Sequence, residues 1–200
     1  MKCIEIYKDI YLVTGKSHKE ICNAFMRIQE HYENPAFVDK KDITKEDVLE
    51  WNKRVHNKSY YQSWGGFNIP IKFLKKLEQD RFIPHSKEER QLLKFFGGIQ
   101  KGYVIGVVAS ADMSILVHEV SHALYSLDIK YKRGALKILH KYNTKRLYNM
   151  MLKMKYDYGV LFDEMVAYLV DGSRHISKRK DLKNALKDNY ISALMRRSIK

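Results

Sequence analysis

Three residues within the segment Ser114–Asp128 have the types and spacing that metal-assisted hydrolysis needs. His118 and His122 are four residues apart, and Glu119 follows the first of them, in the order H-E-x-x-H. In a helix, residues i and i+4 lie on one face, one turn apart, so both imidazoles can point at one cation. Zinc binds neutral imidazole and lowers the pKa of a bound water towards about 7. Glu119 lies about 100° around the helix from His118, at the edge of the same site, where it is placed to take a proton from that water.

The residues around this motif favour a functional site over a chance pattern. Positions 115–117, 120–121 and 123–124 are uncharged, and none of them is Pro or Gly. A helix with such surroundings is buried on most sides, and buried polar side chains need partners. A metal ion would supply a partner to both histidines. The alternative is two core histidines that are bonded to backbone carbonyl oxygens.

Glu164 is the first candidate for the third protein ligand that a catalytic zinc normally has, beside an open position for water. It lies in the segment LFDEMVAYLVDG, whose apolar periodicity predicts a helix over 160–170 that is stopped by Gly172. Asp163 and Glu164 interrupt the apolar run of this helix. A carboxylate in a first helical turn also complements the helix dipole, so a structural role for Glu164 is the alternative.

The stretch from Tyr103 to Gly172 resembles the zincin metallopeptidases, and their gluzincin branch in particular. The resemblance depends on the H-E-x-x-H motif and on Glu164-Met165-Val166-Ala167, which matches the E-x-x-A segment that often follows in gluzincins. It implies a zinc metalloendopeptidase with one Zn²⁺ per chain, which hydrolyses peptide bonds through a zinc-bound water. The implied roles are general base for Glu119 and metal ligand for His118, His122 and Glu164.

The chain departs from related patterns at two positions. Metzincins place a ligand where this chain has Asp128, but they need a Gly where it has Tyr125. A helix that continues through Tyr125 carries Asp128 away from the histidine pair. Some gluzincins place an orienting Asp four residues after the ligand Glu, where this chain has Tyr168. Asp163 or Asp171 would then have to orient a histidine, and the sequence does not choose between them.

Further side chains are candidates for the remaining roles in such a site. A tetrahedral intermediate needs a hydrogen-bond donor for its oxyanion, and we assign this second catalytic role to His175, which follows Gly172 closely. His140 and His175 are also alternative metal ligands, and a fourth ligand from either would make the site closed and structural. The other candidates for the oxyanion donor are Tyr156, Tyr158 and Arg174.

The helices that must position these residues follow from capping patterns and apolar periodicity. Ser17 and Ser86 each precede a Glu by three residues, which is the capping-box pattern, and Thr44 opens a further helix. Beyond Ser110 the whole chain favours helix. The helices predicted there cover residues 112–127, 134–141, 144–155, 160–170 and 178–197.

Strands are expected to be few and confined to the first half of the chain. The candidates are Ile10–Thr14, Tyr103–Val108 and a third near Ser59–Trp64. Tyr103–Val108 is either a cleft edge that pairs with an extended peptide or an ordinary core strand. The prediction is an α+β fold, mainly helical, with a small sheet and a zincin-like active-site helix. Residues 1–200 form one domain, with a mixed part over 1–110 and a helical part over 111–200 that carries the metal site.

Composition and charge limit the cellular setting and the partners. Residues 1–16 carry charges that interrupt any apolar signal segment, and two cysteines make no disulfide framework, so we expect a cytoplasmic protein without a membrane segment. The formal charge is +14, but 27 of the 37 basic residues are Lys. We therefore favour a peptide or protein substrate, acidic if the basic stretch Lys130–Lys155 attracts it. The alternative is a basic nucleic-acid-binding or structural protein with a structural or vestigial metal site.

Overall fold

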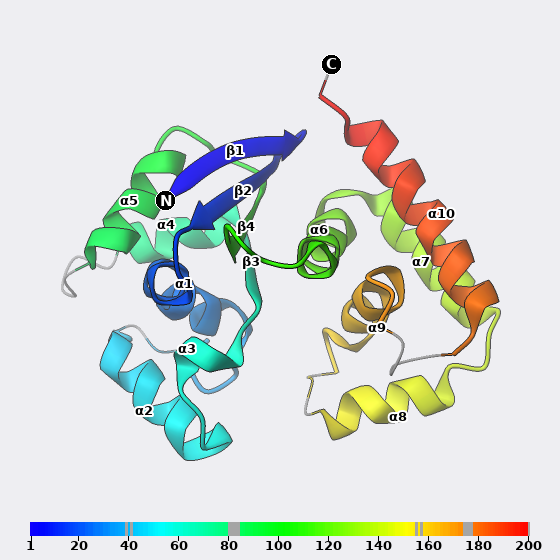
Figure 1. Cartoon of the computed structure of the whole chain (residues 1–200), viewed down its shortest axis with the longest axis horizontal. Coiled ribbons are helices and arrows are strands. Elements are labelled where there is room, and N and C mark those ends of the chain that lie inside the picture. The colour runs from blue at the N-terminus through cyan, green and yellow to red at the C-terminus, as the bar shows by residue number, and fades with distance from the viewer. Residues whose placement is uncertain are drawn as a thin grey trace. The chain divides into compact units, whose positions relative to one another are not determined.

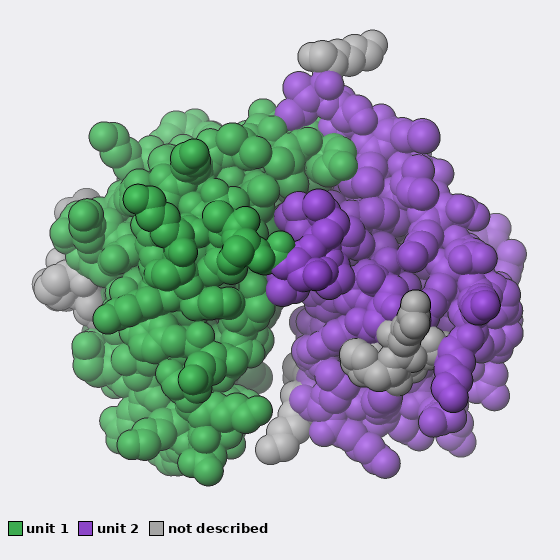
Figure 2. Space-filling view, in the orientation of Figure 1, with its two compact units in different colours: residues 1–111 green, residues 112–200 purple. Residues whose placement is uncertain are grey.

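The structure is a computed structural model that describes residues 1–38, 40, 42–79, 85–154, 156, 158–173 and 178–199. The chain forms two compact units, Met1–Ala111 and Asp112–Lys200, which Figure 2 colours separately. The sheet lies in the first unit, and the described elements of the second are all helices. The predicted α+β, mainly helical fold is therefore confirmed. The prediction that residues 1–200 form one domain stays a prediction.

The first unit is built on a four-stranded sheet in the order β1-β2-β4-β3 (Figure 1). Antiparallel pairing joins β1 (Lys2–Tyr7) to β2 (Ile10–Gly15) and β3 (Gly66–Pro70) to β4 (Tyr103–Val108), while β2 and β4 run parallel. All six residues of β4 are buried, as expected for a strand that is covered on both faces. Of the two alternatives for this strand, the structure supports the ordinary core strand and not the free cleft edge, because β2 and β3 pair with its two edges.

Two strands of this sheet were not predicted, and one predicted strand is a helix. The short helix α3 (Tyr60–Ser63) occupies the segment near 59–64, and β3 begins just after it. β1 is an edge strand with three exposed residues, so its sequence carries little apolar signal. Both strands owe their conformation to pairing with a buried neighbour more than to local propensity.

Helices cover this sheet, and a glycine permits their close approach. Phe25 on α1 stacks on Phe67 of β3 with ring centroids 5.5 Å apart. A Cβ at Gly106 of β4 would lie 2.5 Å from the Phe25 ring, so only glycine fits there. The predicted starts at Ser17, Thr44 and Ser86 are confirmed, because each side chain accepts the N–H three residues on. The remaining helices of this unit are α1 (His18–Glu33), α2 (Lys45–His56), α4 (Ile71–Gln79) and α5 (Lys87–Phe96).

The second unit contains five helices among its described residues, and all five were predicted. α6 packs on α7 and α9, α10 packs on α7 and α9, and α8 packs on α9. α7 begins five residues earlier than predicted, because Asp128 caps it by accepting the backbone N–H groups of Lys130 and Tyr131. The bounds are α6 (Met113–Leu127), α7 (Ile129–His140), α8 (Lys145–Lys153), α9 (Leu161–Val170) and α10 (Lys180–Arg197).

Contacts between α7 and α10 secure the end of the motif helix α6. Gly134 lets the two helices approach, since a Cβ there would lie 2.5 Å from Oδ1 of Asn189. Arg196 of α10 forms an ion pair of 2.9 Å with Asp128, the residue that ends α6 and begins α7. The unit is thus tied together around the segment that carries H-E-x-x-H. Of the helices that the structure describes, none has the length and apolarity needed to cross a membrane.

Candidate metal centre

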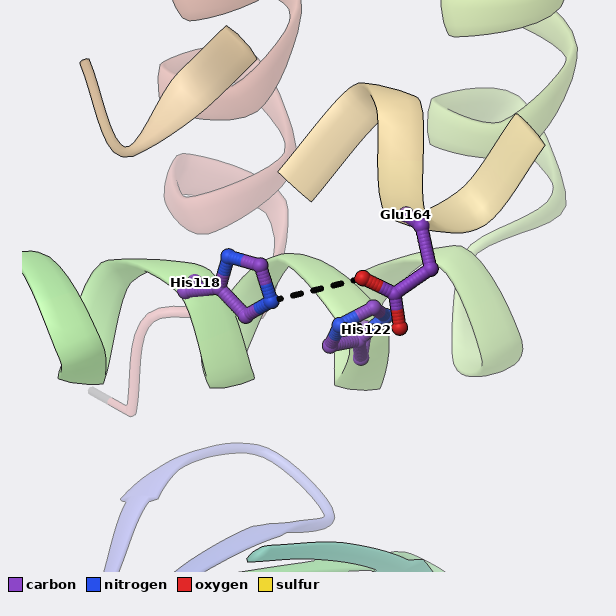
Figure 3. Close-up of side chains that lie close together, drawn as sticks. All are labelled: His118, His122 and Glu164. Carbon is purple, nitrogen blue, oxygen red and sulfur yellow. Dashed lines mark ion pairs between the residues drawn. The ribbon is translucent and has the colours of Figure 1, made fainter. Parts of the chain in front are cut away.

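Two packed helices of the second unit bring together the three predicted ligands. His118 and His122 lie one turn apart on α6, and Glu164 reaches them from the first turn of α9 (Figure 3). The Nε2 atom of His118 is 3.7 Å from Oε2 of Glu164, and Nε2 of His122 is 3.7 Å from Oε1. Each residue offers one ligand atom, and these three atoms lie within 4.8 Å of one another.

The outward nitrogen of each imidazole faces a second carboxylate. Nδ1 of His118 is hydrogen-bonded to Oδ2 of Asp171 at 3.0 Å. Nδ1 of His122 forms an ion pair of 3.0 Å with Oδ1 of Asp163. Such carboxylate partners fix the orientation of ligand histidines and raise their basicity. Here they leave both Nε2 atoms facing Glu164.

The helix α9 supplies all three of these carboxylates. Asp163 and Glu164 lie in its first turn, and Asp171 is its C-cap residue. The chain then turns at Gly172, whose φ of 88° lies in the left-handed region that glycine adopts without strain. This turn is held by Asp171, whose Oδ1 accepts the backbone N–H of Ser173 at 2.6 Å. Each of the two aspartates that the sequence left as candidates for an orienting role therefore faces one of the two histidines.

The electrostatics of the cluster favour a positive charge among its carboxylates. Burial would lower the pKa of His122, but Asp163, Glu164 and Glu119 outweigh it and raise this pKa to about 10. Burial raises the pKa of Glu164, and the two histidines offset only part of that rise. Burial also opposes ionisation of Asp171, but the hydrogen bond from His118 leaves its pKa below the ordinary value.

The donor set and its surroundings fit a divalent cation such as zinc. Oε2 of Glu164 is buried and has no hydrogen-bond partner among the described residues, which is costly for a carboxylate oxygen. It faces Nε2 of His118, as the dashed line in Figure 3 shows. Two imidazoles and one carboxylate are a known ligand set of catalytic zinc. The separation of 3.7 Å is near the roughly 3.3 Å that neighbouring ligands have around tetrahedral zinc.

Glu119 lies at the cluster without belonging to the ligand set. Its side chain is buried on α6, with 6% of the residue exposed. Its charge raises the pKa of both His122 and Glu164, so the carboxylate lies within electrostatic reach of both. A proton acceptor beside a bound metal would have to lie within such reach of the ligands.

Two tyrosines also lie beside the candidate ligands. The Tyr168 ring packs edge-on against His118 with centroids 4.7 Å apart, and its hydroxyl is 2.8 Å from that of Tyr156. Burial and the nearby Glu164 raise the pKa of Tyr156. Tyr168 stands where some gluzincins have the orienting Asp, and Asp171, almost one turn further, makes that contact instead. The spacing 164, 168 and 171 places all three residues on one helical face, but it does not show which of them meets His118.

The other predicted candidates are distributed as follows. Asp128 caps α7 and pairs with Arg196, so its carboxylate is already engaged outside the cluster. His140 is exposed at the end of α7, with its ring 6.3 Å from that of Phe162. Tyr158 is 72% exposed. Arg174 and His175 lie outside the described residues. Within the described part of the chain, the ligand group has three members, which would leave one tetrahedral position open.

Comparison with known proteins gives no information on function, so any assignment depends on the geometry of α6 and α9. No protein-family model, curated protein or solved structure matches this chain. The zincin resemblance therefore remains a resemblance of one motif and one downstream Glu segment. What bears on function is the convergence of His118, His122 and Glu164, together with the carboxylates behind the two histidines.

Proposed function

We propose that this protein is a zinc-dependent metallopeptidase that hydrolyses peptide bonds. The single observation that carries the proposal is the convergence of both Nε2 atoms on Glu164 while both Nδ1 atoms face a carboxylate. Two core histidines that served packing alone would not need four carboxylates around them. The ligands would be His118, His122 and Glu164.

The other steps of peptide hydrolysis would be carried out by side chains around the metal ligands. Zinc supplies, when bound, a Lewis acid that acidifies water and polarises the scissile carbonyl. Glu119 accepts the proton of that water and later delivers it to the leaving nitrogen. Asp163 and Asp171 hold the two imidazoles in the orientation that binding requires. The Tyr156 hydroxyl lies 2.8 Å from that of Tyr168 and is an alternative to His175 as the donor to a developing oxyanion.

The competing interpretation is a structural or vestigial metal site. A structural zinc normally has four protein ligands, whereas the group has three within the described residues. The role of oxyanion donor that we assign to His175 stays a prediction.

The test compares Glu119→Gln with the wild-type protein in metal content and activity. We expect both proteins to hold one equivalent of zinc by plasma mass spectrometry. Hydrolysis of fluorescein-labelled casein should fall about 100-fold or more in the variant, the usual loss when a general base is removed. Glu50→Gln, at an exposed position of α2, is the matched control and should keep full activity. Equal activity of Glu119→Gln and wild type would refute the proposal.

A further inference from the structure

The second unit carries a large excess of basic residues, and most of its acidic residues are engaged at the candidate metal centre or in ion pairs. Residues 112–200 contain 18 Lys and Arg but only nine Asp and Glu, a formal charge of +9. Most of these carboxylates are already engaged: four surround the histidine pair, and two form ion pairs with arginines. The six are Glu119, Asp163, Glu164, Asp171, Asp128 and Asp181. The positive charge of this unit is therefore not balanced locally at its surface.

The helix α7 arranges part of this charge in a straight row. Lys130, Arg133, Lys137 and Lys141, the last of them its C-cap residue, are all exposed. Their spacing of three, four and four residues places them on one helical face, with neighbours about 5–6 Å apart. The opposite face of α7 is its packed face, which carries the buried residues Tyr131, Ala135 and Leu139.

The next helix continues the basic character. Lys145, Arg146 and Lys153 of α8 line an open hollow of about 590 Å³, together with the amides of Asn143 and Asn149. Met150 is the apolar member of this lining. In the part of the chain that the structure describes, none of the basic residues named on α7 and α8 forms an ion pair with a carboxylate. Their charge is directed to solvent and to whatever binds there.

We propose that this basic face of α7 and α8, from Lys130 to Lys153, binds the phosphate backbone of a nucleic acid. A regular row of lysines suits a regular row of phosphates, and such contacts carry no sequence information. An acidic protein partner would need buried aromatic or apolar anchors at the centre of its interface. The large exposed apolar side chains stand only at the two ends of this face, at Ile129 and Met154, so charge complementarity favours nucleic acid. Binding is expected to be independent of sequence and of the metal centre.

The experiment measures anisotropy of a fluorescein-labelled 25-nucleotide single strand between 50 and 300 mM NaCl. A fourfold variant changes Lys130, Arg133, Lys137 and Lys141 to Gln. Each lost phosphate contact lowers the slope of log affinity against log salt by about 0.7, so four contacts lower it by about 2.8. The affinity at 0.1 M salt should then fall by about 100-fold or more.

A matched control removes the same four charges from the first unit. It changes the exposed residues Lys19, Lys53, Lys58 and Lys101 to Gln, and its affinity should stay within about threefold of wild type. Equal losses in the two variants, or no binding by the wild type at 50 mM salt, would overturn the proposal. Displacement of the strand by polyglutamate at equal charge concentration would also overturn it, in favour of an acidic protein partner. Glu119→Gln should bind the strand as the wild type does, which separates this surface from the proposed peptidase.

Discussion

The contact between Asp171 and His118 gives the most specific prediction about the metal centre. Oδ2 of Asp171 bonds to Nδ1 of His118 at 3.0 Å, and the carboxylate is only 7% exposed. Asp171→Asn keeps the size of the side chain and one acceptor oxygen but removes the negative charge. Asp171→Ala removes the partner altogether. The pair of variants therefore separates the charge from the hydrogen bond.

The expected loss follows from what such partners contribute to metal binding. Removing the carboxylate behind a ligand histidine lowers metal affinity about 10- to 100-fold, or about 1.4–2.8 kcal/mol. A hydrogen bond to an ionised group is roughly twice as strong as one between neutral groups. We therefore expect a loss of about tenfold for Asp171→Asn and about 100-fold for Asp171→Ala. Zinc affinity would be measured by competition with a chromophoric chelator at pH 7.5.

Two comparisons show whether such a loss comes from the histidine. Asp181→Asn removes the same charge from an exposed position on α10, where its partner is Arg179, and should bind zinc as the wild type does. The melting temperature of each metal-free variant reports on the turn that Asp171 makes with Ser173. Wild-type zinc affinity in both Asp171 variants would refute the role of this residue in orienting His118.

Other predictions concern the stability of the two units. Asp128→Ala removes the cap of α7 and should lower the free energy of unfolding by about 1–2 kcal/mol in a urea titration; an unchanged midpoint would contradict the cap. Burial opposes ionisation of Asp128, but the N–H of Tyr131 and Arg196 hold its pKa below the ordinary value. Its stabilisation relative to Asp128→Asn should therefore be complete above about pH 4 and disappear as the pH falls further, which acid titrations of both proteins would show. Gly106→Ala forces a Cβ against Phe25 and should cost about 1–3 kcal/mol in the same urea assay; wild-type stability would mean that the helix yields freely.

The cluster of candidate ligands was predictable because its signals are local. His118 and His122 share a helical face by spacing alone, and Glu164 stands out as a carboxylate in an otherwise apolar helix. The orienting residues were not predictable in the same way. Asp163 and Asp171 lie at opposite ends of α9, and which histidine each one meets depends on how α9 crosses α6. How two helices cross depends on the tertiary packing, and it cannot be deduced from the spacing of residues within one helix.

The fold shows the same division between local and non-local signals. Caps at Ser17, Thr44 and Ser86 and the apolar periods beyond Ser110 predicted most helices, because these patterns act within one or two turns. β1 and β3 escaped prediction because their strand conformation depends on partners elsewhere in the chain. The apolar run of β4 predicted a strand. Its interior position in the sheet depends on β2 and β3, which pair with it on either side.

X-ray absorption at the zinc edge tests the central claim most directly. The protein, loaded with one equivalent of zinc, should show nitrogen and oxygen ligands at about 2.0–2.1 Å, with imidazole scattering and no sulfur. Glu164→Ala should bind zinc more weakly and lose one oxygen from that shell. The two cysteines, Cys3 and Cys22, both belong to the first unit, whereas α6 and α9 belong to the second. Sulfur at about 2.3 Å, or a spectrum that Glu164→Ala leaves unchanged, would contradict a zinc site at His118, His122 and Glu164.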